Sequence, residues 1–264
     1  MKIFEIKKSE RHLYQDQIVR LEKMANYPLG SDSFYIDHGK DYFAFFDRLG
    51  ESHYFVCTIN NEVVAVAAGI IRKVPKRVFY LCDLKVHPKY QRKRIPLKIL
   101  SHAALRYYLK CPRGYAIAMD KEKQKENRTA KLLQHFRWLR ITPVEKLSIY
   151  SFSYEDILGH RELIEKHKGP IYFLSLIGIK DLILDSTKFP MKLLHLQYGH
   201  QKQNIKEESI TEAQVGHIHM LALTSNDPLK KELDQLNIHP SSSATVIEHN
   251  MKDFDWNFIR TSDI

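Results

Sequence analysis

The chain has 264 residues, 44% of them hydrophobic, which is enough to bury one large core or two smaller ones. No run of about 18 apolar residues occurs, and the N-terminus lacks the apolar segment of a signal peptide, so we expect a soluble, cytoplasmic protein. The net charge of +10 leaves an anionic partner open, but the basic residues are spread along the chain, apart from 91–94 and 121–125, which argues against a nucleic-acid partner.

The N-terminal part of the chain reads as strands alternating with helices. Residues 1–6 predict a strand, and the apolar spacing over 10–24 predicts a helix. The aromatic-rich stretch 34–46 is compatible with a helix face packed on a sheet; its other interpretation, that it lines the acceptor side of a cleft, is only what a family resemblance implies. Two apolar runs, 53–59 and 63–71, are separated by Asn-Asn-Glu and predict a hairpin.

A strand, a basic turn and a helix follow the hairpin. Residues 78–86 predict the strand, 91–94 form the turn Gln-Arg-Lys-Arg, and apolar residues from Ile95 onward predict a helix to about Lys110. The first N–H groups of a helix have no internal partner and point outward, so this turn predicts a site for a phosphorylated ligand. A further strand at 115–119 is expected to lie parallel to the first.

The residues from Asp83 to Ile95 resemble the acyl-CoA-binding motif of the GCN5-related N-acetyltransferase (GNAT) superfamily. The signature Gln/Arg-x-x-Gly-x-Gly/Ala, laid on this chain, begins at Gln91 and places Arg94 and Pro96 at its two glycine positions. Proline is compatible with the first turn of a helix. Arg94 either replaces backbone contacts with charge-assisted bonds to phosphate or weakens CoA binding.

A second motif of the same family resembles residues 127–139. Asn127, Ala130 and Leu133 match Asn-x-x-Ala-x-x-Leu-Tyr, but Gln134 stands at the tyrosine position, and Trp138-Leu139 stand where Gly-Phe is usual. Many members use that tyrosine to protonate the leaving thiolate, so its absence puts this general acid in doubt. Asn127 would serve equally well as the N-cap of the helix that follows.

The resemblance covers about residues 1–153 and implies an α/β (α+β) fold, a GNAT-like mixed twisted sheet flanked by helices, with a smaller α+β C-terminal domain at 154–264. Two adjacent strands of the family's sheet splay apart to admit the pantetheine arm. The resemblance implies an N-acetyltransferase that uses acetyl-CoA or another acyl-CoA as co-substrate, without a metal. Asp83 is the expected general base. The residues expected to bind the cofactor are Leu84, Val86, Gln91, Arg92, Lys93, Arg94, Ile95, Pro96 and Asn127.

The acceptor is expected to be a small-molecule or peptide amine. A positive protein repels polycations, so we expect a neutral acceptor or one with an acid group beside its amine, such as an amino acid, amino sugar or acidic peptide. The alternative is a catalytically impaired GNAT-fold module that binds CoA or a partner without acyl transfer. The departures at Arg94, Pro96, Gln134 and Trp138 favour that alternative.

Residues 154–264 predict a helix at 154–168, strands at 193–198, 217–223 and 244–248, and a helix at 228–236. This order is compatible with a degenerate second GNAT-like half, although no second Gln-x-x-Gly-like turn occurs. Five histidines in this part are expected to be ordinary sheet residues, because no Asp, Glu or Cys completes a ligand set. They are His195, His200, His217, His219 and His249. The scattered Cys57, Cys82 and Cys111 are expected to be buried thiols.

Overall fold

The computed structural model describes residues 1–264 except 26, 30–31, 75, 121–126 and 200–208. The strands are β1 (Lys2–Ile6), β2 (Tyr27–Leu29), β3 (Asp32–Asp37), β4 (Glu51–Ile59), β5 (Glu62–Val74), β6 (Lys76–Val86), β7 (Gly114–Met119), β8 (Thr142–Phe152), β9 (Ile171–Ser175), β10 (Asp181–Leu184), β11 (Pro190–Met191), β12 (Leu193–Tyr198), β13 (Ile210–Thr211), β14 (Ile218–Thr224) and β15 (Ser242–His249). The α-helices are α1 (Gln15–Glu22), α2 (Ala44–Asp47), α3 (Ile95–Tyr107), α4 (Arg128–Gln134), α5 (Tyr154–Gly159), α6 (Arg161–Lys168) and α7 (Pro228–Gln235).

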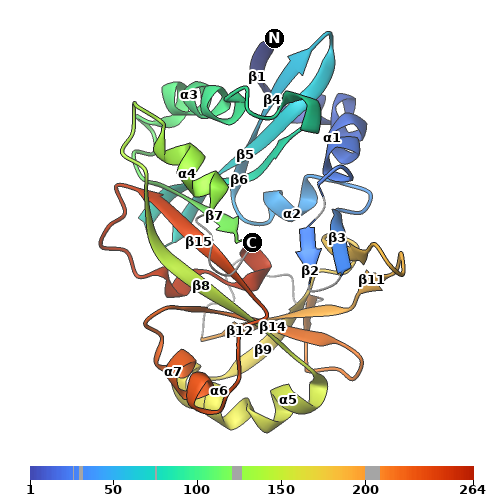
Figure 1. Ribbon diagram of the computed structural model, residues 1–264, viewed down its shortest axis with the longest axis vertical. Coiled ribbons are helices and arrows are strands. Elements are labelled where there is room, and N and C mark those ends of the chain that lie inside the picture. The colour runs from blue at the N-terminus through green and yellow to red at the C-terminus, as the bar shows by residue number, and fades with distance from the viewer. Residues whose placement is uncertain (26, 30–31, 75, 121–126, 200–208) are drawn as a thin grey trace.

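One mixed sheet runs through the whole molecule, with helices on its faces (Figure 1). In the described residues it has eleven strands in the order β1-β4-β5-β6-β7-β15-β8-β14-β12-β9-β13, and a second sheet has the order β11-β10-β3-β2. The predicted fold class is confirmed. No helix of the described chain has the length and apolarity needed to cross a membrane.

The predicted hairpin is β4 and β5, which pair from Glu51 with Ile71 to Ile59 with Glu62. Asn60 and Asn61 turn the chain with φ of 50° and 65°. Both values lie in the left-handed region that two-residue hairpin turns require and that asparagine tolerates. β5 is longer than predicted, because Arg72 and Lys73 still pair with β6.

The sheet of the N-terminal half is buried on both faces, which explains the nearly continuous apolar sequence of β5. Successive residues of β4 face opposite sides: Tyr54 and Val56 pack with α1 and α2, whereas Phe55 and Cys57 pack with α3 and α4. A separate cluster joins α5, α6 and α7 to the C-terminal strands.

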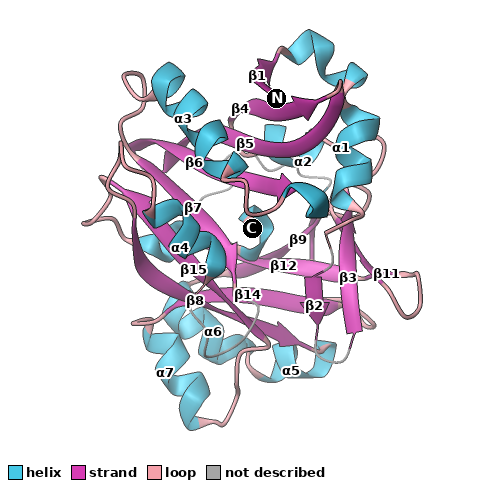
Figure 2. Ribbon diagram, turned by 45° about the horizontal axis from the view of Figure 1, so that its top comes forward, coloured by secondary structure: helices cyan, strands magenta, loops and turns pink. Residues whose placement is uncertain are grey.

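The C-terminal part of the chain completes the sheet of the N-terminal part. β15 is antiparallel to β7 on one side and to β8 on the other, as Figure 2 shows. The small sheet also joins the two parts, because β10 pairs with β3. The division at 153/154 stays a prediction, and the two segments that it separates share both sheets.

Several elements differ from the prediction. The helix expected over 154–168 is interrupted at His160, whose φ of −105° and ψ of 4° lie outside the helical range, and so forms α5 and α6. β9, β10 and β11 were not predicted, and β2 and β3 lie in a stretch expected to be a loop or aromatic helix. These strands are short, and their sequences lack the alternation that identifies a half-buried strand.

Candidate functional site

The large sheet opens between β6 and β7. These parallel strands pair only over Phe79–Leu81 and Gly114–Ala116. Farther along, β6 stays paired with β5 up to Val86, and β7 stays paired with β15 up to Met119. The strands therefore separate toward their C-terminal ends, which is the separation that the GNAT resemblance implies.

A β-bulge lies in β6 just beyond this separation point. Cys82 pairs with Ala68 and Lys85 pairs with Val66, so Asp83 and Leu84 together oppose a single residue of β5. Asp83 has a φ of 54°. Its side chain has no exposed area although the residue as a whole is partly exposed, so the exposed atoms of Asp83 belong to the main chain. The bulge thus presents backbone groups where the strands part.

The Asp83 carboxylate lies in a buried polar cluster. The hydroxyl of Tyr42 donates to its two oxygens at 2.9 and 2.8 Å, and the Lys85 ammonium pairs with it. Lys85 Nζ also lies 2.6 Å from Oε2 of Glu22. The role of Asp83 as general base stays a prediction. Because its carboxylate is fully covered and already paired, it could act on an acceptor amine only through an intervening water molecule.

The same cluster contains two buried polar atoms that make no hydrogen bond to the described residues, although one of them, Nε2 of His38, lies 4.0 Å from Oε2 of Glu22. These are Oε1 of Glu22 and Nε2 of His38. Burial, and after it the nearby charges of Lys85 and Lys180, lower the pKa of His38 to about 3. His38 is therefore neutral at physiological pH and contributes a polar ring without a charge.

The basic turn occupies the position predicted for phosphate binding. Gln91, Arg92, Lys93 and Arg94 are all exposed, and α3 begins directly after them. Arg92 and Arg94 have φ of 64° and 53°. Arg94 therefore holds the left-handed conformation that explains why the family places glycine here.

The remaining residues predicted to contact the cofactor differ in exposure. The side chain of Ile95 is buried in the core beneath α3, so only its backbone could reach a ligand. Pro96 lies in the first turn of α3. Leu84 and Val86 are partly buried against the α3 side of the core.

Asn127 is the N-cap of α4. Its Oδ1 accepts from the backbone N–H groups of Thr129 and Ala130 at 3.0 and 3.1 Å. Its Nδ2 donates to the carbonyl oxygen of Ala118 and to Oδ1 of Asp120, both at 2.9 Å. The capping interpretation is the one that the structure shows, and these bonds already use both amide hydrogens.

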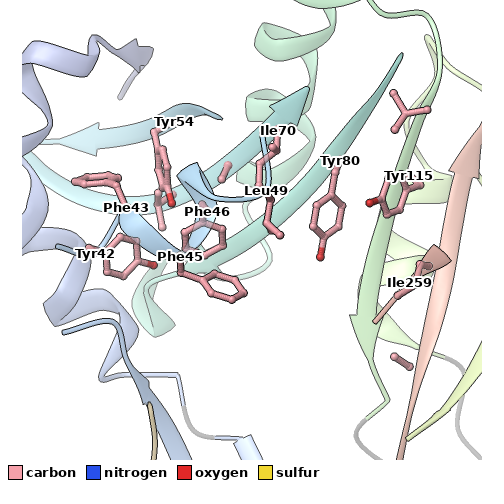
Figure 3. Packing of buried hydrophobic residues seen from close by; sticks show 14 of the residues in the cluster. Tyr42, Phe43, Phe45, Phe46, Leu49, Tyr54, Ile70, Tyr80, Tyr115 and Ile259 are labelled. Atoms are coloured by element: carbon pink, nitrogen blue, oxygen red, sulfur yellow. The ribbon is translucent and has the colours of Figure 1, made fainter. Parts of the chain in front are cut away.

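The aromatic stretch is mainly core. Tyr42, Phe43, Phe45 and Phe46 are buried in one cluster, as Figure 3 shows. The rings of Tyr42, Phe43 and Phe46 contact Tyr54, and Phe45 packs on Phe46. Packing on the sheet was one of the two predicted interpretations. Tyr80 of β6 and Tyr115 of β7 stack with ring centroids 4.6 Å apart where the two strands are still paired.

The C-terminal histidines bond to the chain itself. His195 bonds to Thr261, His219 accepts from the Gln214 N–H, His217 lies beside the Val215 carbonyl, and His249 lies beside the Arg140 carbonyl. His200 and the basic run 121–125 lie outside the described residues. Among the described residues, no group of three or more His, Cys, Asp or Glu side chains could hold a metal. Cys57 and Cys111 are buried and Cys82 is partly buried.

The sequence reasoning missed Glu22, Tyr42, Lys85 and Lys180. Glu22 ends a short helix and looks like a solvated residue, yet it is only 2% exposed. Lys85 could be predicted to lie beside Asp83, because it stands two residues away on the same predicted strand and alternate strand residues share a face. The bulge changes that alternation and could not be predicted.

Comparisons with known proteins agree with this geometry. Residues 16–133 match the family model described as Acetyltransferase (GNAT) family. An uncharacterized protein, L340, of Acanthamoeba polyphaga mimivirus is 25% identical over 242 residues, covering 85% of this chain and 68% of its own.

The chain is also similar to two solved structures that differ in how much of it they cover. A tandem GNAT protein from the clavulanic acid biosynthesis pathway has a TM-score of 0.54 and 9% identity, covering 94% of this chain and 98% of its own. A putative acetyltransferase from Thermoplasma acidophilum has a TM-score of 0.44 and 16% identity, covering 74% of this chain and 77% of its own. Residues 16–133 of the chain therefore match the acetyltransferase (GNAT) family, and the fold of the longer chain is similar to that of a tandem GNAT protein.

Proposed function

We propose that the protein is an acyl-CoA-dependent N-acyltransferase, with acetyl-CoA as the first candidate co-substrate. The observation that carries this proposal is the coincidence of three features along β6: the separation from β7, the backbone exposed at Asp83, and the exposed basic turn ahead of α3. A pantetheine arm would lie between the separated strands near Leu84 and Val86. The pyrophosphate would lie at Gln91–Arg94 and the first turn of α3.

The reaction needs little from the protein. A neutral amine adds to the thioester carbonyl and forms the C–N bond, and a main-chain N–H at the bulge would stabilise the resulting oxyanion. Collapse of that oxyanion then breaks the C–S bond. CoA leaves as a thiolate that takes up a proton. Because the Asp83 carboxylate lies behind the strand, the amine proton would reach it through a water molecule.

A GNAT-fold module that binds CoA without transfer is the second candidate. The ion pairing of Asp83 with Lys85 favours it, since a paired carboxylate is a weaker base. Gln134 also supports it, because the residue is exposed on α4 where family members carry a tyrosine.

Two measurements separate these functions. Calorimetric titration with acetyl-CoA tests binding, and release of free thiol with a panel of amines tests transfer. Binding with thiol release above the hydrolysis rate supports the transferase. Binding without release supports the module, and a failure to bind contradicts both.

A further inference from the structure

Three basic side chains lie against aromatic rings of the core cluster that contains α1 and α2. Lys180 Nζ lies 4.7 Å from the centroid of the Phe45 ring, and the guanidinium carbon of Arg48 lies 4.9 Å from the same centroid. The guanidinium of Arg72 lies 5.8 Å from the Tyr80 ring centroid. Tyr80 is on β6, three residues before the bulge.

A segment of the same chain, Thr261–Asp263, lies against these cations. Its residues are 4%, 2% and 7% exposed. Asp263 Oδ2 is 3.1 Å from Arg72, the Asp263 carbonyl accepts from the Tyr80 hydroxyl at 3.0 Å, and the Ser262 carbonyl accepts from Arg48. The segment therefore offers one carboxylate and two carbonyl oxygens to the cationic group.

The charges are not balanced by this contact. Arg48 donates to a neutral carbonyl oxygen, and its buried Nε has no hydrogen-bond partner in the described residues. No carboxylate in the described part of the chain is within ion-pair distance of Lys180. Among the described residues, this buried group contains four basic side chains and three carboxylates, so the charges balance only when one basic side chain is neutral. These are Arg48, Arg72, Lys85 and Lys180 against Glu22, Asp83 and Asp263.

A buried cation without an anionic partner is destabilising, and a planar guanidinium pairs best with a carboxylate. Burial accordingly lowers the pKa of Arg48 and, together with the Arg48 charge, lowers the pKa of Lys180 to about 7. An additional anion would stabilise the charged forms of both residues.

We propose that Arg48, Arg72 and Lys180 form a carboxylate-binding subsite for the acceptor, which the Asp263 side chain fills until an acceptor with an acid group displaces it. The role as an acceptor subsite rests on the proposed acyltransferase function. The subsite predicts that the acceptor is an amine that also carries a carboxylate. Displacement exchanges one carboxylate for another at Arg72 and gives Arg48 and Lys180 an anionic partner.

Direct binding of glutarate tests the subsite without catalysis. Asp263→Asn removes the competing carboxylate, so this variant should bind glutarate at least about 10-fold more tightly than the unaltered protein in calorimetric titration. Arg72→Gln added to Asp263→Asn should abolish that gain. Asp253→Asn, an exposed position in the same C-terminal segment, is the matched control and should bind glutarate like the unaltered protein. A folded, CoA-binding Asp263→Asn variant with no gain would overturn the proposal.

Acceptor preference provides a second test if Asp263→Asn fails to fold. Thiol release with β-alanine should exceed that with β-alaninamide by about 10-fold in kcat/KM, and Arg48→Gln should bring that ratio close to one. An equal or inverse preference in the unaltered protein would overturn the subsite.

If no amine is acylated, the transferase proposal fails. Glutarate binding to the unaltered protein and to Arg48→Gln then decides whether the subsite exists. Binding that Arg48→Gln weakens supports it, whereas no binding, or equal binding by both, overturns it.

Discussion

Arg94 shows how one side chain can replace a glycine at a backbone position that favours glycine. Its φ of 53° is in the left-handed region, where a non-glycine residue costs about 1–2 kcal/mol. The guanidinium is exposed and could bind phosphate, so the substitution exchanges backbone strain for charge at the turn.

Arg94→Gly should therefore stabilise the fold while weakening CoA binding. The gain should be roughly 0.5–1 kcal/mol, because glycine relieves the strain but loses more conformational entropy on folding. Chemical denaturation measures stability, and calorimetry measures affinity. Lys93→Gly is the control, since its φ is not positive, and it should destabilise the protein. A variant that is less stable than the unaltered protein would show that Arg94 is not strained.

Asp83 differs from Arg94 in that its side chain is fully buried. Asp83→Asn keeps the shape but removes the charge that balances Lys85, and it should lower turnover by about 100-fold or more while leaving CoA affinity unchanged. Thiol-release kinetics and calorimetry measure the two quantities separately. Asp16→Asn on the exposed side of α1 is the control. Full activity in Asp83→Asn would show that the residue is structural.

At the scale of elements, α4 depends on its N-cap. Asn127→Ala removes the oxygen that accepts from two backbone N–H groups, which should cost about 1 kcal/mol of stability. CoA affinity should stay within about twofold, because the amide already bonds to the chain. Asn127→Ser retains a capping oxygen and should recover much of the loss. A large loss of CoA affinity in a stable variant would instead assign Asn127 to the cofactor site.

The elements that the sequence predicted well are those with strong local signals. The β4–β5 hairpin follows from its two asparagines, and α3 follows from its apolar spacing and from the turn before it. The pairing of β15 between β7 and β8 joins residues 93 to 135 positions apart, and no local pattern encodes it.

In the candidate site, too, only the part that is contiguous in sequence was predictable. The turn at Gln91–Arg94 was predictable, since it is contiguous in sequence and helix N-termini attract anions. The cluster of Glu22, Tyr42, Asp83 and Lys85 was not, because it requires α1, the segment before α2 and the bulge of β6 to meet.

At the scale of the whole molecule, the buried charges between the two parts of the chain make stability depend on pH. Lys180 follows β9, and its burial is the largest cause that lowers its pKa from an ordinary 10.5 to about 7. The nearby charge of Arg48 lowers this pKa further, whereas that of Asp263 raises it.

Between these pH values the unfolded chain binds a proton at Lys180 that the folded protein does not, so this residue's contribution to stability rises with pH. Relative to Lys180→Met, which cannot titrate, the unaltered protein should gain stability from about pH 7 to about pH 10. Chemical denaturation of both proteins at several pH values measures the difference. Parallel pH profiles would show that Lys180 is charged in the folded protein.

The central claim is that CoA binds where β6 and β7 separate, with its pyrophosphate at the basic turn. Calorimetric titration of CoA into the unaltered protein and into Arg92→Glu at low and moderate salt tests it most directly, with Arg20→Glu on the exposed side of α1 as the control for equal charge change. We predict that Arg92→Glu weakens binding steeply and reduces its salt dependence, while Arg20→Glu does neither. Equal affinity and equal salt dependence in all three proteins would contradict the claim.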